Sequence, residues 1–258
     1  MSVAAVQVGA VAGRSIKRTL RQPAMSVPPL VFPVALMLVN SAGLEPSTLL
    51  PGFPTTSFLA FALAVPFIQG ALFATMNAGT ELARDLQTGF LNRLSLTSLR
   101  GSALLLGHLT GVVVLGVVQA VFYIAVGLIL GVDFASGPAG IVLLLIFSAL
   151  VALGFGALGA FLALRTGTGE AVQSMFPLLF VFLFISSMNT PRDLIAVDWF
   201  RFLASINPVS YLIECVRSLI ITGWDARALA LGFGIAMIIA VVSLVLSAWA
   251  LSRRMTRT

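Results

Sequence analysis

Charged residues are scarce in this 258-residue sequence. Only 9% of the residues are Asp, Glu, Lys or Arg, while 59% are hydrophobic and the mean hydropathy is +1.07. Soluble domains carry about 25% charged residues, because a polar surface has to cover their apolar core. The composition therefore excludes a soluble protein and predicts an integral membrane protein. The formal net charge of +6 fits basic residues at membrane boundaries and indicates no nucleic-acid partner.

Residues that bind metals, form disulfides or hold nucleotides are almost absent. The chain has one cysteine, Cys215, and one histidine, His108. It therefore forms no intramolecular disulfide and offers few of the three or four ligands of a zinc site. The only lysine, Lys17, is followed by Arg18, whereas a phosphate-binding loop needs Ser or Thr there. We expect no cofactor on this chain, and in particular no ATP held by a phosphate-binding loop.

The sequence contains six hydrophobic runs, and all but the fifth reach the roughly 20 residues that a helix needs to cross a bilayer. The sequence thus predicts an all-α membrane protein with six transmembrane helices. The first run contains three prolines and is expected to start irregularly, and the fifth is short. The runs cover residues 24–43, 57–79, 102–130, 139–164, 171–188 and 228–251.

The positions of the basic residues predict the orientation. With both termini in the cytoplasm, most Lys and Arg residues fall in inside segments, and the first two outside loops contain none. This distribution predicts a multi-pass protein of the cytoplasmic (inner) membrane. Residues 1–23 precede the six-helix domain at 24–258 and predict an amphipathic helix on an anionic lipid surface, or alternatively a solvated basic tail. Its basic face consists of Arg14, Lys17, Arg18 and Arg21.

The interiors of the predicted spans lack Asp, Glu, Lys and Arg. Ion-coupled transporters and pumps place such residues at depth, so their absence argues against both classes. The polar side chains at depth are amides, namely Gln69, Asn77 and Gln119. Hydrogen bonding between helices is the simpler interpretation of these amides, and contact with a transported molecule is the alternative.

The segment that follows the second run and reaches into the start of the third, residues 81–109, is too polar to cross a bilayer and too regular for a plain loop. Leu82, Leu86, Phe90 and Leu94 recur at every fourth position, which predicts an amphipathic helix. Such a helix either docks into a groove on a soluble partner or only anchors the neighbouring spans.

A second unusual segment, INPVSYLIECVRSLIITGW at 206–224, predicts a helix too short to cross. Asn207 is a favourable N-cap, and Pro208 suits the first helical position. Gly223 is a natural C-terminal stop. About fifteen helical residues extend roughly 22 Å, so this helix is expected to lie half-buried in the outer leaflet or against the bundle.

The two faces of this helix differ in polarity. Its apolar residues follow the helical period and predict a face against lipid or protein. Glu214 and Arg217 are spaced i, i+3 on the opposite face, so they can pair and are expected to face water or a partner. A further amphipathic stretch precedes this helix, so we expect two short outer helices within residues 189–224.

These two segments resemble those of the permease subunits of ABC-2 type ABC transporters, especially the daunorubicin-resistance-like drug and lipid exporters. The resemblance covers nearly the whole chain. Segment 81–109 is similar to the family's Glu-Arg-Glu-x-Gly-Thr … Thr-Pro stretch, with departures at Phe90 and Ser98. Segment 206–224 is similar to the family's Asn-Pro-x-x-Tyr … Glu/Asp … Arg … Gly pattern. The matching residues are Asn207, Pro208, Tyr211, Glu214, Arg217 and Gly223.

The resemblance implies an exporter of hydrophobic or amphipathic molecules such as drugs and lipids. Two permease copies, or one copy and a sister permease, would sit among membrane lipids and bind separate ATPase subunits that hold ATP and Mg²⁺. The resemblance implies that segment 81–100 couples to the ATPase through Glu81, Arg84, Asp85, Gly89, Arg93 and Arg100. It suggests an outer-gate helix that carries Asn207, Pro208, Tyr211, Glu214 and Arg217.

The sequence leaves other functions open. A permease for a polysaccharide or lipid-linked glycan would favour an aromatic groove, and the chain has only 3 Trp and 2 Tyr. An intramembrane enzyme would need a nucleophile and a base facing each other at depth, and the sequence gives His108 no evident partner. A membrane scaffold without transport activity is a further alternative.

Overall fold

The computed structural model describes residues 13, 23–89 and 101–255, and these residues form helices and connecting loops without any strand. The predicted interfacial helix at 1–23 therefore lies almost entirely outside the described residues, and so do Arg93 and Arg100. The α-helices are α2 (Pro23–Leu44), α3 (Phe58–Ala62), α4 (Ala64–Gln87), α6 (Gly101–Ile129), α7 (Gly137–Thr166), α8 (Gly169–Ser174), α9 (Phe176–Phe184), α10 (Asp198–Ile206), α11 (Pro208–Arg217) and α12 (Ala226–Met255). Two 3₁₀ turns, η1 (Glu45–Leu49) and η2 (Arg192–Leu194), and a π turn, η3 (Ser218–Thr222), complete the described elements.

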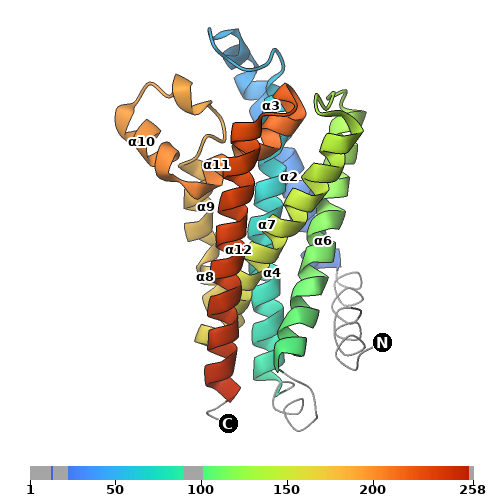
Figure 1. Cartoon of the computed structure of the whole chain (residues 1–258), viewed down its shortest axis with the longest axis vertical. Helices are drawn as coiled ribbons and strands as arrows, with labels where there is room; N and C mark the ends of the chain where they lie inside the picture. Colours follow the sequence, from blue (N-terminus) through green and yellow to red (C-terminus); the bar gives the residue numbers. More distant parts are fainter. Residues whose placement is uncertain (1–12, 14–22, 90–100, 256–258) are drawn as a thin grey trace.

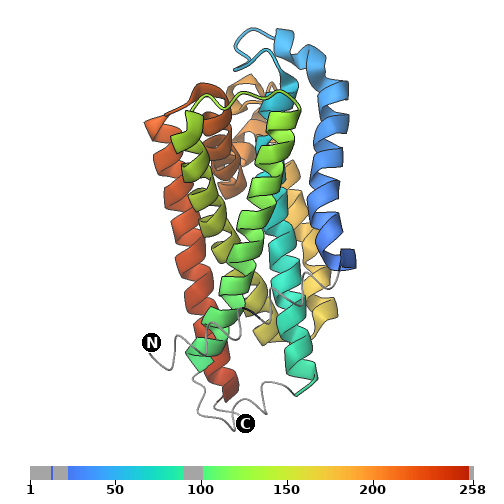
Figure 2. The ribbon, with the colours of Figure 1, turned by 90° about the vertical axis from the view of Figure 1, so that its right-hand side faces the viewer.

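The long helices α2, α4, α6, α7 and α12 run side by side along one axis (Figures 1 and 2). Helices α10 and α11 lie at one end of this bundle, which we call the α10–α11 end. Helix α4 ends, α6 begins and α12 ends at the opposite end. The segment that contains α10 and α11 is thus separated by the length of the bundle from the ends of α4 and α12 and the start of α6.

Five helical stretches are long and apolar enough to cross a membrane, and they agree with five of the six predicted spans. They are Val27–Leu49, Phe58–Gln87, Leu105–Ile129, Gly137–Thr166 and Ala226–Arg254. The expected fifth span is instead a shorter apolar stretch, Gly169–Phe184, made of α8 and α9. At 1.5 Å per residue it extends about 24 Å, less than the roughly 30 Å of a hydrocarbon core.

Pro177 explains why this stretch is broken. A proline cannot donate to the carbonyl four residues before it, and it disfavours a helical conformation in the preceding residue. Helix α8 ends before Met175, whose N–H donates to the Val172 carbonyl at 3.2 Å. Helix α9 then restarts with Pro177 in its first turn, where the missing N–H costs little.

Helix α2 is continuous through its three prolines, so the expected irregular start does not occur. Pro33 has no N–H to donate to the carbonyl of Pro29, four residues earlier. The hydroxyl of Tyr123, on α6, donates to that carbonyl at 2.5 Å. Neighbouring helices satisfy freed carbonyls in this way within membranes. Tyr123 is buried. Because its hydroxyl replaces the missing N–H of Pro33, Tyr123 stabilises α2 from the neighbouring helix α6.

Helix α4 occupies the centre of the bundle. In its most apolar window 89% of the residues are buried inside the chain, against 22–44% in the other four candidate spans. It packs along α7, and small residues let the two backbones meet. A Cβ atom on Gly159 would lie 2.0 Å from the carbonyl oxygen of Thr75. Only glycine fits at that crossing.

Candidate functional site

The chain between α9 and α12 folds over the α10–α11 end. It leaves α9, passes η2 and α10, and returns through α11 and η3 to the start of α12. Two short helices thus occur within residues 189–224, where the sequence predicts them. Most of the predicted outer-gate residues belong to α11, which packs against both α4 and α12.

Asn207 caps α11 as predicted. Its side-chain oxygen accepts a hydrogen bond from the N–H of Val209 at 2.9 Å, and Pro208 occupies the first turn. The amide nitrogen of Asn207 also donates to the carbonyls of Phe182 and Ile185, at 2.5 and 3.0 Å. Because those carbonyls belong to the end of α9, Asn207 joins the broken helix to α11.

The C-terminal part of this segment winds differently from the expectation. The α-helix ends at Arg217, and the chain continues as the π turn η3. Gly223 ends it with φ +87°, a conformation that suits glycine, as the sequence predicts. The loop between α6 and α7 holds the turn, since the hydroxyl of Ser136 donates to the Leu219 carbonyl at 2.7 Å.

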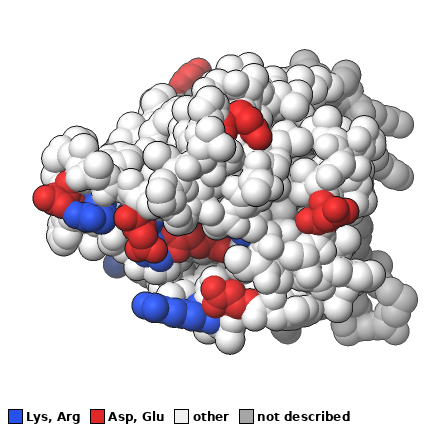
Figure 3. Space-filling view, turned by 90° about the horizontal axis from the view of Figure 1, so that it is seen from above, with Lys and Arg blue, Asp and Glu red and all other residues white. Residues whose placement is uncertain are grey.

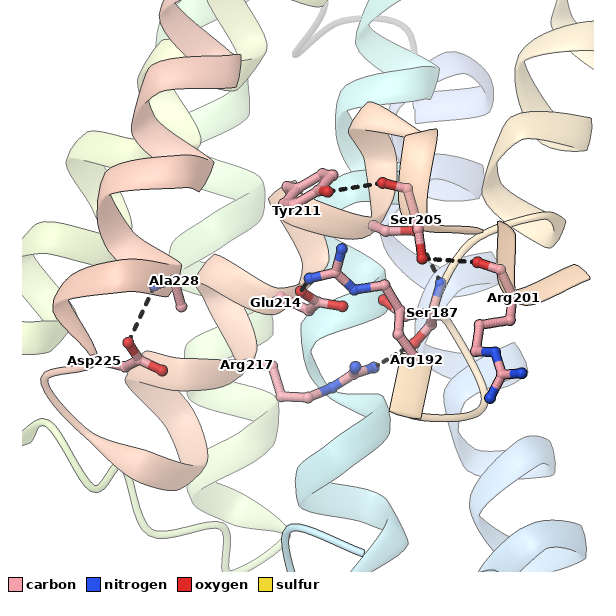
Figure 4. Close-up of polar contacts among 10 residues, drawn as sticks. Ser187, Arg192, Arg201, Ser205, Tyr211, Glu214, Arg217, Asp225 and Ala228 are labelled. Atoms are coloured by element: carbon pink, nitrogen blue, oxygen red, sulfur yellow. Dashed lines mark hydrogen bonds and ion pairs between the residues drawn. The ribbon is translucent and has the colours of Figure 1, made fainter. Parts of the chain in front are cut away.

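Glu214 forms its ion pair with Arg192 rather than with Arg217, which corrects the pairing expected from the i, i+3 spacing. Nη2 of Arg192 lies 2.5 Å from Oε2 of Glu214. The Arg192 guanidinium also lies over the Tyr211 ring, 4.3 Å from its centroid. The Tyr211 hydroxyl donates to the Ser205 carbonyl at 2.7 Å. This group joins η2, α10 and α11 (Figure 4).

Arg217 is buried, so it does not face water, the first of the two surroundings expected for it. Its side chain is 6% exposed. Nε donates to the Phe61 carbonyl at 3.3 Å, and Nη2 donates to the carbonyls of Ser187 and Met188, each at 3.1 Å. The guanidinium also stacks 3.5 Å from the centroid of the Phe61 ring, a favourable cation–π arrangement.

The physical reason for this reversal is that three backbone carbonyls accept hydrogen bonds from Arg217 inside the chain. Phe61 lies in the last turn of α3, where a helix leaves carbonyls free, and Ser187 and Met188 lie in the loop after α9. Burial lowers the pKa of Arg217 to about 9, with Glu214 acting in the opposite direction. Arginine with such a pKa stays charged at neutral pH.

A cleft of about 550 Å³ opens beside α11. Glu214, Arg217 and Tyr211 line it from α11, and charged residues of η2, α10 and the start of α12 complete its walls. Figure 3, which looks down on the α10–α11 end, shows acidic and basic side chains gathered at one side of this face. The charged and aromatic lining residues are Phe61, Arg192, Asp193, Arg201, Tyr211, Glu214, Arg217, Asp225 and Arg227.

The described part of the predicted coupling segment lies at the opposite end of the bundle. Glu81, Arg84 and Asp85 belong to the last turns of α4, and Arg84 is exposed. Leu82, on the apolar face, is buried, as the predicted amphipathic pattern requires. Gly89 follows the helix with φ +66°, a left-handed conformation that suits glycine.

The three amides at depth have different surroundings. Gln69 is fully buried, and no described residue forms a hydrogen bond with its amide. Gln119 lies beside Gly70, where a Cβ would come within 3.2 Å of its Oε1 atom. Asn77 is partly exposed. The favoured interpretation, hydrogen bonding between helices, therefore fails for Gln69 among the described residues.

Two contacts of the described chain were not evident in the sequence. The sequence indicates no partner for His108, but its Nε2 atom lies 3.0 Å from the Ala78 carbonyl oxygen. Arg192 lies 22 residues from its partner Glu214, and no local spacing signals such a pair.

Over the described residues, no three His, Cys, Asp or Glu side chains converge as a metal site requires.

Comparison with known proteins gives two matches. Residues 6–221 match the family model described as ABC-2 type transporter. A curated protein of Cyanophora paradoxa, with the provisional name transport permease ycf38, is 27% identical over 165 residues. That match covers 63% of this chain and 56% of the relative, so the matched part spans about half of the relative's length.

Proposed function

Since the chain belongs to the ABC-2 type transporter family, we propose that it is the membrane subunit of an ATP-driven exporter in the cytoplasmic membrane. Its cargo is a hydrophobic or amphipathic molecule, such as a drug or a lipid. ATP and Mg²⁺ bind to separate ATPase subunits, and the chain pairs with a second copy or a sister permease. Both termini and the 81–100 segment lie on the ATPase side.

The observation that carries this proposal is the separation of two charged regions by an apolar bundle. Each candidate span contains an 18-residue window with at most 2 charged residues. The described end of the coupling segment lies at one end of the bundle, and the charged cleft lies at the other. A charge-poor passage between them suits an apolar cargo, because a hydrated ion would lose its water there.

Helix α4 supports a route for the coupling. It runs without interruption from Ala64 to Gln87, so its last turns and its first turn move as one rod. Near its first turn, Arg217 binds the carbonyl of Phe61 in the adjoining helix α3, and α11 also packs directly against α4. A displacement of Glu81 and Arg84 by an ATPase would therefore reach the outer helices as a rigid-body movement.

One experiment tests the ATPase side. Arg84→Glu combined with Arg93→Glu should reduce retention of the cognate ATPase subunit through purification and reduce ATPase stimulation in bilayers. Arg201→Glu, at the α10–α11 end, is the matched control and should leave retention unchanged. Full retention and full stimulation in the double variant would remove this segment from the coupling route.

The orientation has its own test. An exposed cysteine placed at Ala196 or at Gln87 reports which side each end faces. In sealed vesicles, a membrane-impermeant thiol reagent should reach the two positions from opposite sides. Labelling of both positions from one side would contradict the proposed topology.

The cargo class is tested by ATP-dependent movement of labelled lipids and cationic dyes in reconstituted vesicles. Stimulation by these compounds supports the proposal. Stimulation only by a polyprenyl-linked sugar would assign the chain to glycan export instead.

A further inference from the structure

The cleft at the α10–α11 end contains two arginines, Arg217 and Arg227, that form no ion pair with a described carboxylate. Four arginines and three carboxylates line the cleft. The other two arginines are paired, Arg192 with Glu214 and Arg201 with Asp198. Oδ1 of Asp225 accepts hydrogen bonds from the N–H groups of Arg227 and Ala228 at 2.9 and 3.1 Å, which caps α12.

Arg217 is the most constrained of these charges. It is 6% exposed and lines the cleft, yet no described carboxylate forms an ion pair with it. Its partners are three carbonyls and an aromatic ring, which carry no net charge. No described residue accepts a hydrogen bond from its Nη1 atom. Glu214 attracts this charge without touching it, and a buried charge that lacks a direct ion pair is costly. An anion beside Arg217 would therefore lower the free energy of this arrangement.

Arg227 supplies a second donor on the same cleft. It lies in the first turn of α12, and its side chain is exposed. No described residue forms a hydrogen bond or an ion pair with its guanidinium, although its backbone N–H binds Asp225. Arg201 also lines the cleft but is paired with Asp198. Arg217, through its Nη1 atom alone, and Arg227, through its whole guanidinium group, are therefore the two cleft arginines with donors left for a ligand.

We propose that this cleft is a binding site for a phosphate group, held by Arg217 at the base and Arg227 at the mouth. Arg227 can present the paired N–H donors that match phosphate oxygens, and Arg217 can add the N–H groups of its Nη1 atom. The volume of about 550 Å³ lies within the roughly 300–1,000 Å³ usual for small-molecule sites, so it admits more than a bare ion. The phosphate comes either from free solution or from the headgroup of an acidic lipid, and the proposal does not depend on transport.

The first arm of the test uses inorganic phosphate. The purified full-length chain is unfolded by heat at increasing phosphate, with the ionic strength held constant by chloride. The midpoint should rise for the wild type and for Arg201→Gln. For Arg227→Gln the phosphate concentration needed for the same rise should increase about tenfold, because one charge-assisted hydrogen bond is lost.

The second arm uses lipid. The same three proteins are reconstituted in phosphatidylcholine vesicles with and without phosphatidic acid, and retained lipid is counted by native mass spectrometry after extraction. The wild type and Arg201→Gln should retain phosphatidic acid, and Arg227→Gln should not. Arg217→Lys, which keeps the charge, is added because Arg217→Gln removes donors from three carbonyls and can unfold the protein.

The arms distinguish the two sources. A response to inorganic phosphate identifies a free anion, and retention of phosphatidic acid alone identifies a lipid headgroup. Either result with the stated difference between Arg227→Gln and Arg201→Gln supports the site. Equal losses in the Arg201 and Arg227 variants indicate general charge attraction and overturn it, and so does the absence of a response in both arms.

Discussion

Arg192 and Glu214 form an ion pair across 22 residues of sequence, with 2.5 Å between Nη2 and Oε2. The pair connects η2 to α11, and each side chain is about one quarter exposed, at 24% and 23%. Since Arg192 also stacks on Tyr211, the contact fixes the connection between α9 and α10 against α11. The ion pair therefore holds η2 and α11, which line the cleft, together.

A double-mutant cycle on this pair should show coupling. We expect Arg192→Gln and Glu214→Gln each to lower the unfolding midpoint, and the double variant to lower it by less than the sum. Because both groups are partly exposed, the coupling should amount to about 1 kcal/mol or less. The exposed pair Arg201–Asp198, at 46% and 89% exposure, is the control and should couple more weakly. Additive effects at Arg192 and Glu214 would show that the pair contributes nothing.

The hydrogen bond from Tyr123 to Pro29 gives a second prediction. Tyr123→Phe should destabilise the protein by about 1–3 kcal/mol, because a buried carbonyl loses its donor. In a Pro33→Ala background the cost should largely vanish, since an alanine at this position restores the helical N–H that reaches the same carbonyl. Unfolding in detergent measures both. An equal cost of Tyr123→Phe in the two backgrounds would mean that the hydroxyl does not substitute for the missing N–H.

Two glycines on α12 give a third prediction. A Cβ on Gly232 would lie 2.2 Å from the Cβ of Cys215, whereas a Cβ on Gly234 would meet nothing within 4 Å. Gly232→Ala should therefore push α12 from α11 and cost about 1–3 kcal/mol. Gly234→Ala, on the same helix, should be neutral or slightly stabilising. Comparable losses of stability in the two variants would argue against close packing at this crossing.

The single cysteine gives a fourth prediction. Burial raises the pKa of Cys215 to about 12, and the thiolate is the reactive form. At pH 8 only about one thiol in ten thousand is ionised, so maleimide should label Cys215 only after unfolding. An exposed cysteine at Ala196 should react at once and serves as the control. Rapid labelling of native Cys215 would indicate that α11 leaves the bundle.

The sequence predicts much of the fold because bilayer crossing depends on length and composition. Five apolar runs became long helices, and the signals at Asn207, Pro208 and Gly223 mark the cap, the first turn and the stop of the α11–η3 segment. Local chemistry decides those features, so they can be predicted from neighbouring residues.

The side-chain contacts of the candidate site could not be predicted in this way. The i, i+3 spacing makes Glu214 and Arg217 available to each other, but both side chains bind partners far along the chain. Helix periodicity also assigned Arg217 to the polar face, expected to meet water or a partner. Carbonyls at the end of α3 and in the loop after α9 made burial favourable there, and only the assembled bundle brings these segments together.

The burial of α4 has a consequence for how the protein is made. Its most apolar window has a mean hydropathy of 1.9, against 2.6–2.8 for the three later candidate spans, and it carries Gln69 and Thr75 among its buried residues. The ribosome delivers α4 before α6, α7 and α12, so these polar side chains first meet lipid instead of protein. Insertion of α4 is then less favourable than insertion of these three later helices, whose arrival encloses its polar side chains within protein.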